Sequence, residues 1–122
     1  MGARRKAVEP SEKQVQAAIV DHWRTFRLPD TLVAAIPNAR AFGQPGLTPG
    51  LPDLLVMGPR VPCGVGFIEL KRTLGGRMSK AQIEIQNLCA RLGVQYWIAG
   101  RDSAIGILEN WGIVKPQARR AA

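Results

Sequence analysis

The apolar residues of the chain follow two different spacings, which divide it into predicted helices and strands. Between residues 11 and 26 they fall three or four positions apart, the spacing of an amphipathic helix. Ser11 and Gln14 stand in the arrangement of a capping box, so we expect the helix to begin there. The face that this helix should bury consists of Val15, Ile19, His22, Trp23 and Phe26.

Short apolar runs elsewhere in the chain are typical of strands. The runs 53–58 and 66–71 are separated by a turn rich in proline and glycine, which predicts a hairpin. Their nearly continuous hydrophobicity predicts that both of their faces are buried. Two further strands are expected at 31–36 and 94–99.

A second helix is predicted over residues 79–93, with Ser79 as its N-cap and Gly93 as its stop. A closing helix is expected over residues 101–112, capped by Asp102. The predicted order is αβββαβα, an α/β fold in which helices cover a sheet. The stripe that the second helix should bury consists of Ala81, Ile85, Leu88, Cys89 and Leu92.

The length of 122 residues fits one folded domain. We expect that domain at 11–112, with basic tails at 1–10 and 113–122. No apolar run approaches the 18 residues that span a bilayer, and the two cysteines lack zinc-binding spacing. These features predict a cytoplasmic protein with reduced thiols, no membrane association and no organic cofactor.

The net charge bears on the partner of the protein. Seventeen lysines and arginines against nine acidic residues give a formal charge of +8, which favours a polyanion such as nucleic acid. Anionic membranes and acidic proteins also attract a basic chain, so charge alone does not name the partner.

Two opposite charges interrupt the predicted strand 66–71. Glu69 and Lys71 point to the same face, because side chains alternate along a strand. Asp53 begins the neighbouring strand, so the hairpin would bring both carboxylates to one end of the sheet. Such carboxylates repel unless a cation lies between them, and oxygen ligands without His or Cys favour Mg²⁺ or Mn²⁺. An exposed ion pair between Glu69 and Lys71 is the alternative.

The motifs "PGLPD", "ELK" and "SKAQ", in this order and spacing, resemble those of the PD-(D/E)XK nuclease superfamily. Within it they most resemble the VRR-NUC family of structure-selective DNA nucleases. The resemblance runs from the first predicted helix to about Trp111. It implies a restriction-endonuclease-like αβββαβ core with a mixed central sheet flanked by helices, and an endonuclease that needs Mg²⁺ or Mn²⁺.

Carried over to this sequence, the resemblance makes Asp53 and Glu69 the acidic metal ligands and turns the backbone carbonyl of Leu70 towards the metal. Lys71 is similar to the catalytic lysine, which holds the attacking water or the phosphate, or accepts a proton. Gln82 is similar to the active-site glutamine of the family.

Glu12 and Gln86 each have two interpretations. Glu12 is similar to the acidic residue that many family members supply from the first helix to complete the inner or outer shell of the metal, but a carboxylate there also interacts favourably with the helix dipole. Gln86 shares a helix face with Gln82 and would contact DNA from there, but that edge of the helix could equally face solvent.

Basic and polar residues flank the proposed site, and we expect them to contact DNA phosphates, with solvated loops as the alternative. These residues are Asn38, Arg40, Arg72, Arg77 and Lys80. His22 lies on the apolar face of its helix and is left out of the site. The tryptophans Trp23, Trp97 and Trp111 are predicted to be core residues.

The expected function is therefore a metal-dependent endodeoxyribonuclease that selects branched DNA such as four-way (Holliday) junctions. Cutting two strands symmetrically requires two related active sites, which implies a homodimer. The alternatives are a catalytically inactive DNA-binding module, or a nuclease that acts on RNA, on flaps or on duplex DNA.

Overall fold

The computed structural model of the protein describes residues 11–37, 46, 48–71 and 78–118. Over these residues the chain forms a four-stranded sheet and three α-helices, and the predicted order αβββαβα is confirmed. The elements are α1 (Glu12–Phe26), β1 (Leu32–Ala35), β2 (Leu54–Met57), a short 3-10 turn η1 (Pro62–Gly64), β3 (Val65–Leu70), α2 (Lys80–Leu92), β4 (Gln95–Ala99) and α3 (Arg101–Asn110).

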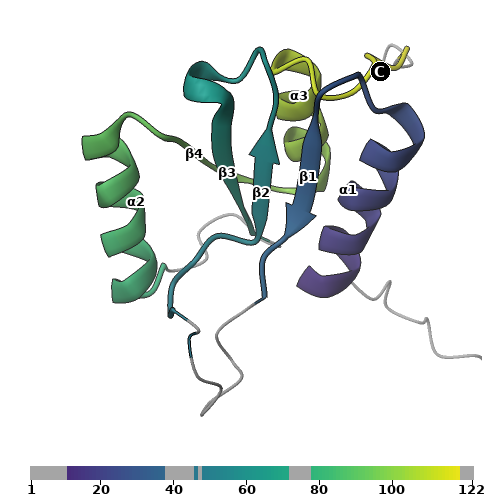
Figure 1. Ribbon diagram of the computed structural model, residues 1–122. Coiled ribbons are helices and arrows are strands. Elements are labelled where there is room, and N and C mark those ends of the chain that lie inside the picture. Colours follow the sequence, from purple (N-terminus) through teal and green to yellow (C-terminus); the bar gives the residue numbers. More distant parts are fainter. Residues whose placement is uncertain (1–10, 38–45, 47, 72–77, 119–122) are drawn as a thin grey trace, which may run out of the picture.

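The strands lie in the order β1-β2-β3-β4, which makes a mixed sheet. The predicted hairpin is confirmed: β2 and β3 are antiparallel, with Leu54 opposite Ile68 and Met57 opposite Val65. β1 also pairs with β2 in antiparallel fashion, whereas β3 and β4 are parallel. A parallel pair needs a crossover connection, and the segment that contains α2 provides it (Figure 1).

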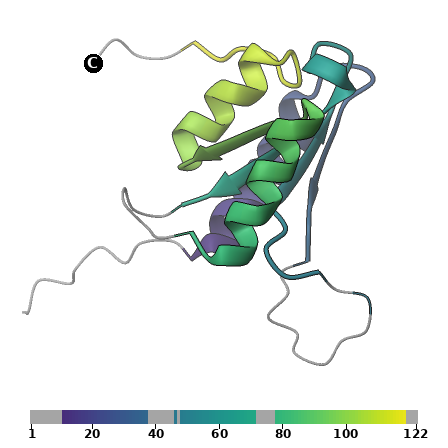
Figure 2. The same cartoon turned by 90° about the vertical axis from the view of Figure 1, so that its left-hand side faces the viewer.

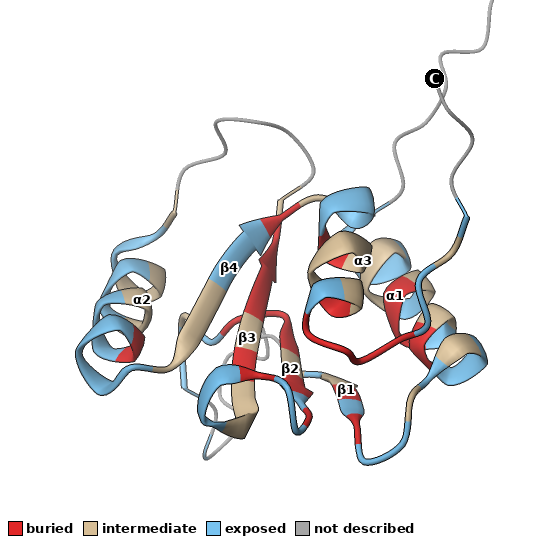
Figure 3. Ribbon diagram, turned by 90° about the horizontal axis from the view of Figure 1, so that it is seen from above, coloured by how far each residue is buried: buried red, intermediate tan, exposed pale blue. Residues whose placement is uncertain are grey.

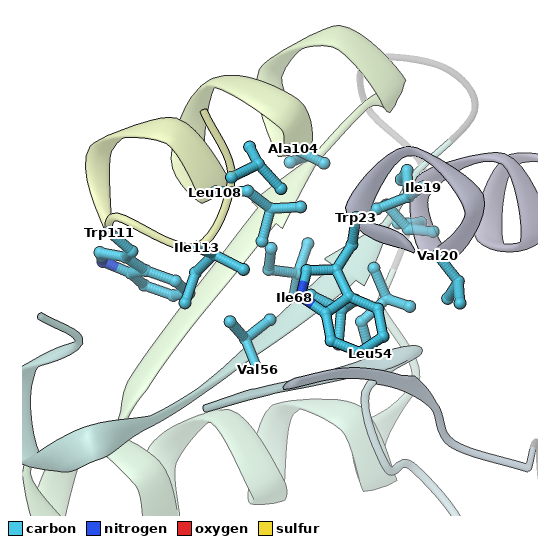
Figure 4. Packing of buried hydrophobic residues seen from close by; sticks show 14 of the residues in the cluster. Ile19, Val20, Trp23, Leu54, Val56, Ile68, Ala104, Leu108, Trp111 and Ile113 are labelled. Atoms are coloured by element: carbon cyan, nitrogen blue, oxygen red, sulfur yellow. The ribbon is translucent and has the colours of Figure 1, made fainter. Parts of the chain in front are cut away.

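The helices divide unequally between the two faces of the sheet. α1 and α3 cover one face, and α2 lies alone against the other, as Figures 1 and 3 show. Figure 2 looks onto α2 in front of the sheet. The main core fills the space under α1 and α3, where Ile19 and Trp23 meet Leu54, Ile68 and Leu108 (Figure 4). This confirms the predicted apolar face of the first helix.

The segment after α3 returns to the end of α1. The backbone N–H of Leu28 donates to the carbonyl of Ile113 at 2.9 Å, and the N–H of Lys115 donates to the carbonyl of Phe26 at 2.9 Å. Ile113 and Val114 are fully buried in the core. The packed part of the chain therefore extends beyond the boundary at residue 112 that the sequence suggested.

The boundaries of the second helix are confirmed, but its predicted buried stripe is partly wrong. Cys89 is buried, whereas Leu88 and Leu92 are exposed, because α2 packs mainly on β4 and leaves the β1–β2 half of that face open. For the same reason Met57 of β2 is exposed. The predicted burial of β2 on both faces is thus wrong at this residue.

Two further predictions near β4 are wrong. Trp97 is 47% exposed, on β4, which is the last strand of the described sheet and has a neighbouring strand on one side only. Trp23 and Trp111 are buried as predicted. Asp102 does not cap α3: the N-cap is Gly100, whose N–H donates to the Ser103 hydroxyl at 2.9 Å.

Both cysteines, Cys63 and Cys89, are free thiols in the described part of the chain. None of the helices formed by the described residues has the length and apolar character to cross a membrane.

Ile68→Ala tests the importance of the core between the sheet and the helices α1 and α3. Ile68 is fully buried at the centre of β3, so its truncation should lower the free energy of unfolding by about 2–5 kcal/mol. Met57→Ala is the matched control, since Met57 is exposed on the open side of β2. Denaturant unfolding measures both changes. Equal destabilisation by the two substitutions would contradict a one-sided core.

Candidate active site

The residues predicted to act together meet at one end of the sheet. Asp53 directly precedes β2, Glu69 lies near the end of β3 and Lys71 directly follows it. The first turn of α2 carries Gln82, and the first turn of α1 carries Glu12. All four elements have these ends at the lower edge of the molecule in Figure 1.

Asp53 is held by hydrogen bonds to both its main chain and its side chain. Its backbone carbonyl accepts from the N–H of Ile36 at 2.8 Å and from Nε2 of Gln16 at 2.7 Å. Its Oδ2 accepts from the backbone N–H of Leu70 at 2.7 Å, which ties the start of β2 to the end of β3. The residue is only 9% exposed, so these contacts fix a nearly buried carboxyl group.

Glu69 is buried even more completely, at 3% exposure. Its pKa is raised from 4.5 to about 9, mainly by burial and further by the hydrogen bond with the Asp53 carboxyl and by the Asp53 charge. The two carboxyl groups thus lie close enough to share a proton. The predicted convergence of Asp53 and Glu69 is confirmed, and an exposed ion pair as the explanation for Glu69 is excluded.

Lys71 and Glu12 have opposite effects on the pKa of the Glu69 carboxyl group. The charge of Lys71 lowers the pKa of Glu69, and the charge of Glu12 raises it. The ammonium of Lys71 and the carboxylate of Glu12 therefore both lie within electrostatic range of Glu69. The backbone N–H of Lys71 donates to the carbonyl of Ala99 at 3.0 Å, which anchors it beside β4.

Gln82 joins the start of α2 to Glu69. Its Oε1 accepts from the backbone N–H of Ser79 at 2.8 Å, and the Ser79 hydroxyl accepts from the N–H of Gln82 at 3.1 Å, as a capping box requires. The Nε2 of Gln82 then donates to Oε2 of Glu69 at 3.1 Å. Because the cap uses the amide oxygen, only the amide nitrogen is left to face the carboxyl group.

Gly50 brings the loop before Asp53 against the first turn of α2. Its φ is +85°, and a Cβ atom at this position would lie 2.5 Å from the backbone carbon of Ala81. Only glycine permits this approach, since any side chain would collide with the helix backbone. The contact sets the spacing between the strand that carries Asp53 and the helix that carries Gln82.

Other predicted residues are only partly accounted for. Asn38, Arg40, Arg72 and Arg77 lie outside the described residues. In addition, Lys80 is exposed at the start of α2, and Gln86 is half-buried one turn after Gln82.

His22 packs its ring against Phe26 at a centroid distance of 4.7 Å, in α1. Its Nε2 is buried and has no hydrogen-bond partner within the described residues. Among these residues no contact links it to the carboxyl pair, in keeping with its exclusion from the predicted site.

The sequence-based prediction missed Gln16, whose amide reaches the carbonyl of Asp53. Its spacing was a usable signal: Gln16 follows Glu12 by one helical turn and so shares its face. What the spacing could not give was the partner, since the two bonded residues are 37 positions apart.

The chemistry of this end of the sheet is that of oxygen ligands. Within the described ranges, no group of three His, Cys, Asp or Glu side chains is placed to hold a metal ion. Asp53 and Glu69 alone supply two carboxyl groups, and repulsion between them is the condition that a divalent cation relieves. Hard cations such as Mg²⁺ complete such a set with carbonyls and waters.

The buried carboxyl pair predicts how the stability of the metal-free protein depends on pH. The pKa of Glu69 is about 9 in the folded protein against its ordinary value of 4.5, so the folded state binds the extra proton between these values. The free energy of unfolding should therefore fall as the pH rises from about 5 to 9, by up to about 1.4 kcal/mol per pH unit. Urea denaturation in a chelator measures this slope.

Glu69→Gln should flatten the dependence, because the amide does not titrate. Glu84→Gln, at an exposed position of α2, is the matched control and should leave the slope as it is in the wild type. An unchanged slope in Glu69→Gln would show that other groups cause it.

Gly50→Ala tests the contact between the loop and α2. Gly46→Ala is a closely matched control, because Gly46 has the same φ of +85° and an added Cβ would have no atom of the described residues within 4 Å. Both substitutions should cost about 1–2 kcal/mol for the left-handed backbone conformation, and Gly50→Ala should cost more through its collision with Ala81. Thermal or urea unfolding compares them, and an equal loss would mean that the loop simply moves away.

Comparison with known proteins reveals similarity in structure. No protein-family model matches the sequence, and no curated protein matches it. A solved structure described as a VRR_NUC domain is similar to this chain, with a TM-score of 0.55 and 22% sequence identity. The match covers 80% of this chain and 91% of the other. The chain therefore shares the fold of this VRR_NUC domain, an α/β fold with a mixed central sheet as the sequence predicted.

Proposed function

We propose that the protein is a metal-dependent endodeoxyribonuclease that hydrolyses phosphodiester bonds. One observation carries the proposal: the buried carboxyl groups of Asp53 and Glu69 share a hydrogen bond at the end of the β2–β3 hairpin, with Lys71 beside them. Burying two carboxyl groups together costs free energy unless a cation or hydrogen-bond donors compensate their charge, so such a pair points to a functional role. The likeness in fold to a VRR_NUC domain supports the proposal that this role is catalysis by a nuclease.

The residues at this site fit Mg²⁺ or Mn²⁺. Asp53 and Glu69 would hold the ion with their carboxylates, and the Leu70 carbonyl is a third candidate ligand. The Leu70 N–H points to Asp53, and the N–H and C=O of one strand residue point to the same side. Continuing the register would set Pro52 opposite Leu70, and proline has no N–H to occupy that carbonyl. Glu12, whose charge acts on Glu69, would add a water-mediated contact.

When bound, such an ion polarises a phosphoryl oxygen and lowers the pKa of a bound water. The ammonium of Lys71, already within range of Glu69, would stabilise the negative charge that develops on the phosphate, or orient the attacking water. Gln82 keeps Glu69 in place through its amide nitrogen. In this proposal Asp53 and Glu69 would hold the ion, Lys71 would contact the phosphate and Gln82 would fix the position of Glu69.

DNA is the favoured substrate because the chain carries a formal charge of +8. Lys80 is exposed in the first turn of α2, the turn that also carries Gln82, and would contact a phosphate near the cut. We infer that Asn38, Arg40, Arg72 and Arg77 contribute further contacts, and that Gln86 lines the same side of α2.

Selectivity for branched DNA, such as four-way junctions, and a homodimeric state are the finer parts of the proposal. Two symmetrical cuts need two active sites related by a two-fold axis. Leu88 and Leu92 lie one turn apart on the exposed side of α2, and neighbouring exposed apolar residues support a partner surface.

Asp53→Asn and Lys71→Ala test the catalytic proposal. With Mn²⁺ or Mg²⁺ the wild type should cut labelled four-way junctions in preference to flaps, duplexes and matched RNA. Each variant should lose about 100-fold or more of the cleavage rate. Binding without metal, measured by gel shift in a chelator, should stay within the same order of magnitude, because the basic surface is intact.

Two matched controls make the same chemical changes away from the site. Asp102→Asn and Lys115→Ala alter exposed residues of α3 and of the segment that follows it, and should cleave as the wild type does. Binding without any metal-dependent cleavage of DNA or RNA would sink the enzyme hypothesis and leave the DNA-binding module. Preference for an RNA junction would reassign the substrate.

A further inference from the structure

The hydroxyl of Tyr96 in β4 is buried and has no hydrogen-bond partner among the described residues. Buried polar side-chain atoms in folded proteins nearly always have one, and a phenol both donates and accepts. An apolar ring would fill the same space at no such cost. The unpartnered hydroxyl therefore requires an explanation in terms of what it can reach.

Tyr96 lies on the same face of the sheet as Glu69. In the parallel pairing of β3 and β4, Tyr96 is opposite Phe67, and Glu69 follows Phe67 by two residues, which returns it to the same face. A long aromatic side chain reaches such a diagonal neighbour. Trp97, the next residue, points to the opposite face, where its Nε1 donates to Gln95 at 3.2 Å.

The surroundings of the hydroxyl keep it protonated. Burial raises the pKa of the Tyr96 phenol, and the charges of Glu69, Cys89 and Asp53 raise it further, in that order. The carboxyl pair is thus within electrostatic range of the phenol, from a strand that the predicted site did not include. The proton that Tyr96 carries is available for donation.

We propose that the Tyr96 hydroxyl is a positioning donor for the Glu69 carboxylate, directly or through one bridging water, when Glu69 binds a divalent cation. The inference rests on the proposed function and extends it. Glu69 accepts from Gln82 at Oε2, from the side of α2. A donation from Tyr96, on β4, would fix the carboxylate from a second direction.

This arrangement matches a general property of metal sites, in which the carboxylates that bind the ion are themselves hydrogen-bonded. The loss of such an outer partner weakens metal binding by about 10- to 100-fold. A hydroxyl with only a packing role behaves differently, because its removal relieves an unpaired buried group.

Tyr96→Phe separates the two roles, since it removes the hydroxyl and keeps the ring. Isothermal titration of the full chain with Mn²⁺ should give an affinity about 10- to 100-fold weaker than that of the wild type. The melting temperature in a chelator should be unchanged or higher. Tyr96→Phe that binds Mn²⁺ as tightly as the wild type would overturn the inference.

Two controls define which contact is lost. Trp97→Phe changes the neighbouring aromatic residue on the opposite face and should leave Mn²⁺ binding intact. Cys89→Ala removes the other polar group near the phenol. If this variant lost as much Mn²⁺ affinity as Tyr96→Phe, the hydroxyl would act through the Cys89 thiol and not on Glu69, which would contradict the inference. If the wild type binds no Mn²⁺, the proposed metal-dependent function is wrong. If the wild type binds Mn²⁺ and Tyr96→Phe binds it equally well, only the inference about Tyr96 is wrong.

Discussion

The burial of two carboxyl groups at one end of the sheet is the constraint on which the rest of the site depends. Asp53 and Glu69 share a hydrogen bond in a place with little access to water, which raises the pKa of Glu69. The surrounding elements each supply a compensating group: the N–H of Leu70 from β3, the amide of Gln82 from α2 and the charge of Lys71. Two apolar side chains buried at the same place would need no hydrogen-bond donor and no opposite charge.

The fold brings these groups together through its connections. The β2–β3 hairpin sets the two carboxyl groups side by side, and the crossover to the parallel strand β4 lays α2 over the opposite face from α1. The first turn of α2 then meets the loop at Gly50, while α1 reaches Asp53 through Gln16. The capping box of α2 has two functions as a result, since Gln82 both starts the helix and contacts Glu69.

The two faces of the sheet differ in their residues and in how completely helices cover them. The core under α1 and α3 is buried and apolar, and its packing stabilises the sheet. The face under α2 carries the ionisable groups and is only partly covered, with Met57, Leu88 and Leu92 exposed. Partial cover leaves room for a substrate or a second subunit, which a fully packed face would exclude.

The sequence by itself determined the order of elements, the capping of the first two helices and the convergence of Asp53 with Glu69, because caps, spacing and hairpins are local. Only the tertiary structure decided which apolar positions are covered. Leu88 and Trp97 have core-like spacing, yet they are exposed, since their burial depends on how far α2 and the sheet overlap. It likewise decided that Gln16 meets Asp53 across 37 positions. The spacing of apolar residues predicts which side chains share a face of a helix or strand, but only tertiary packing decides whether another element covers that face.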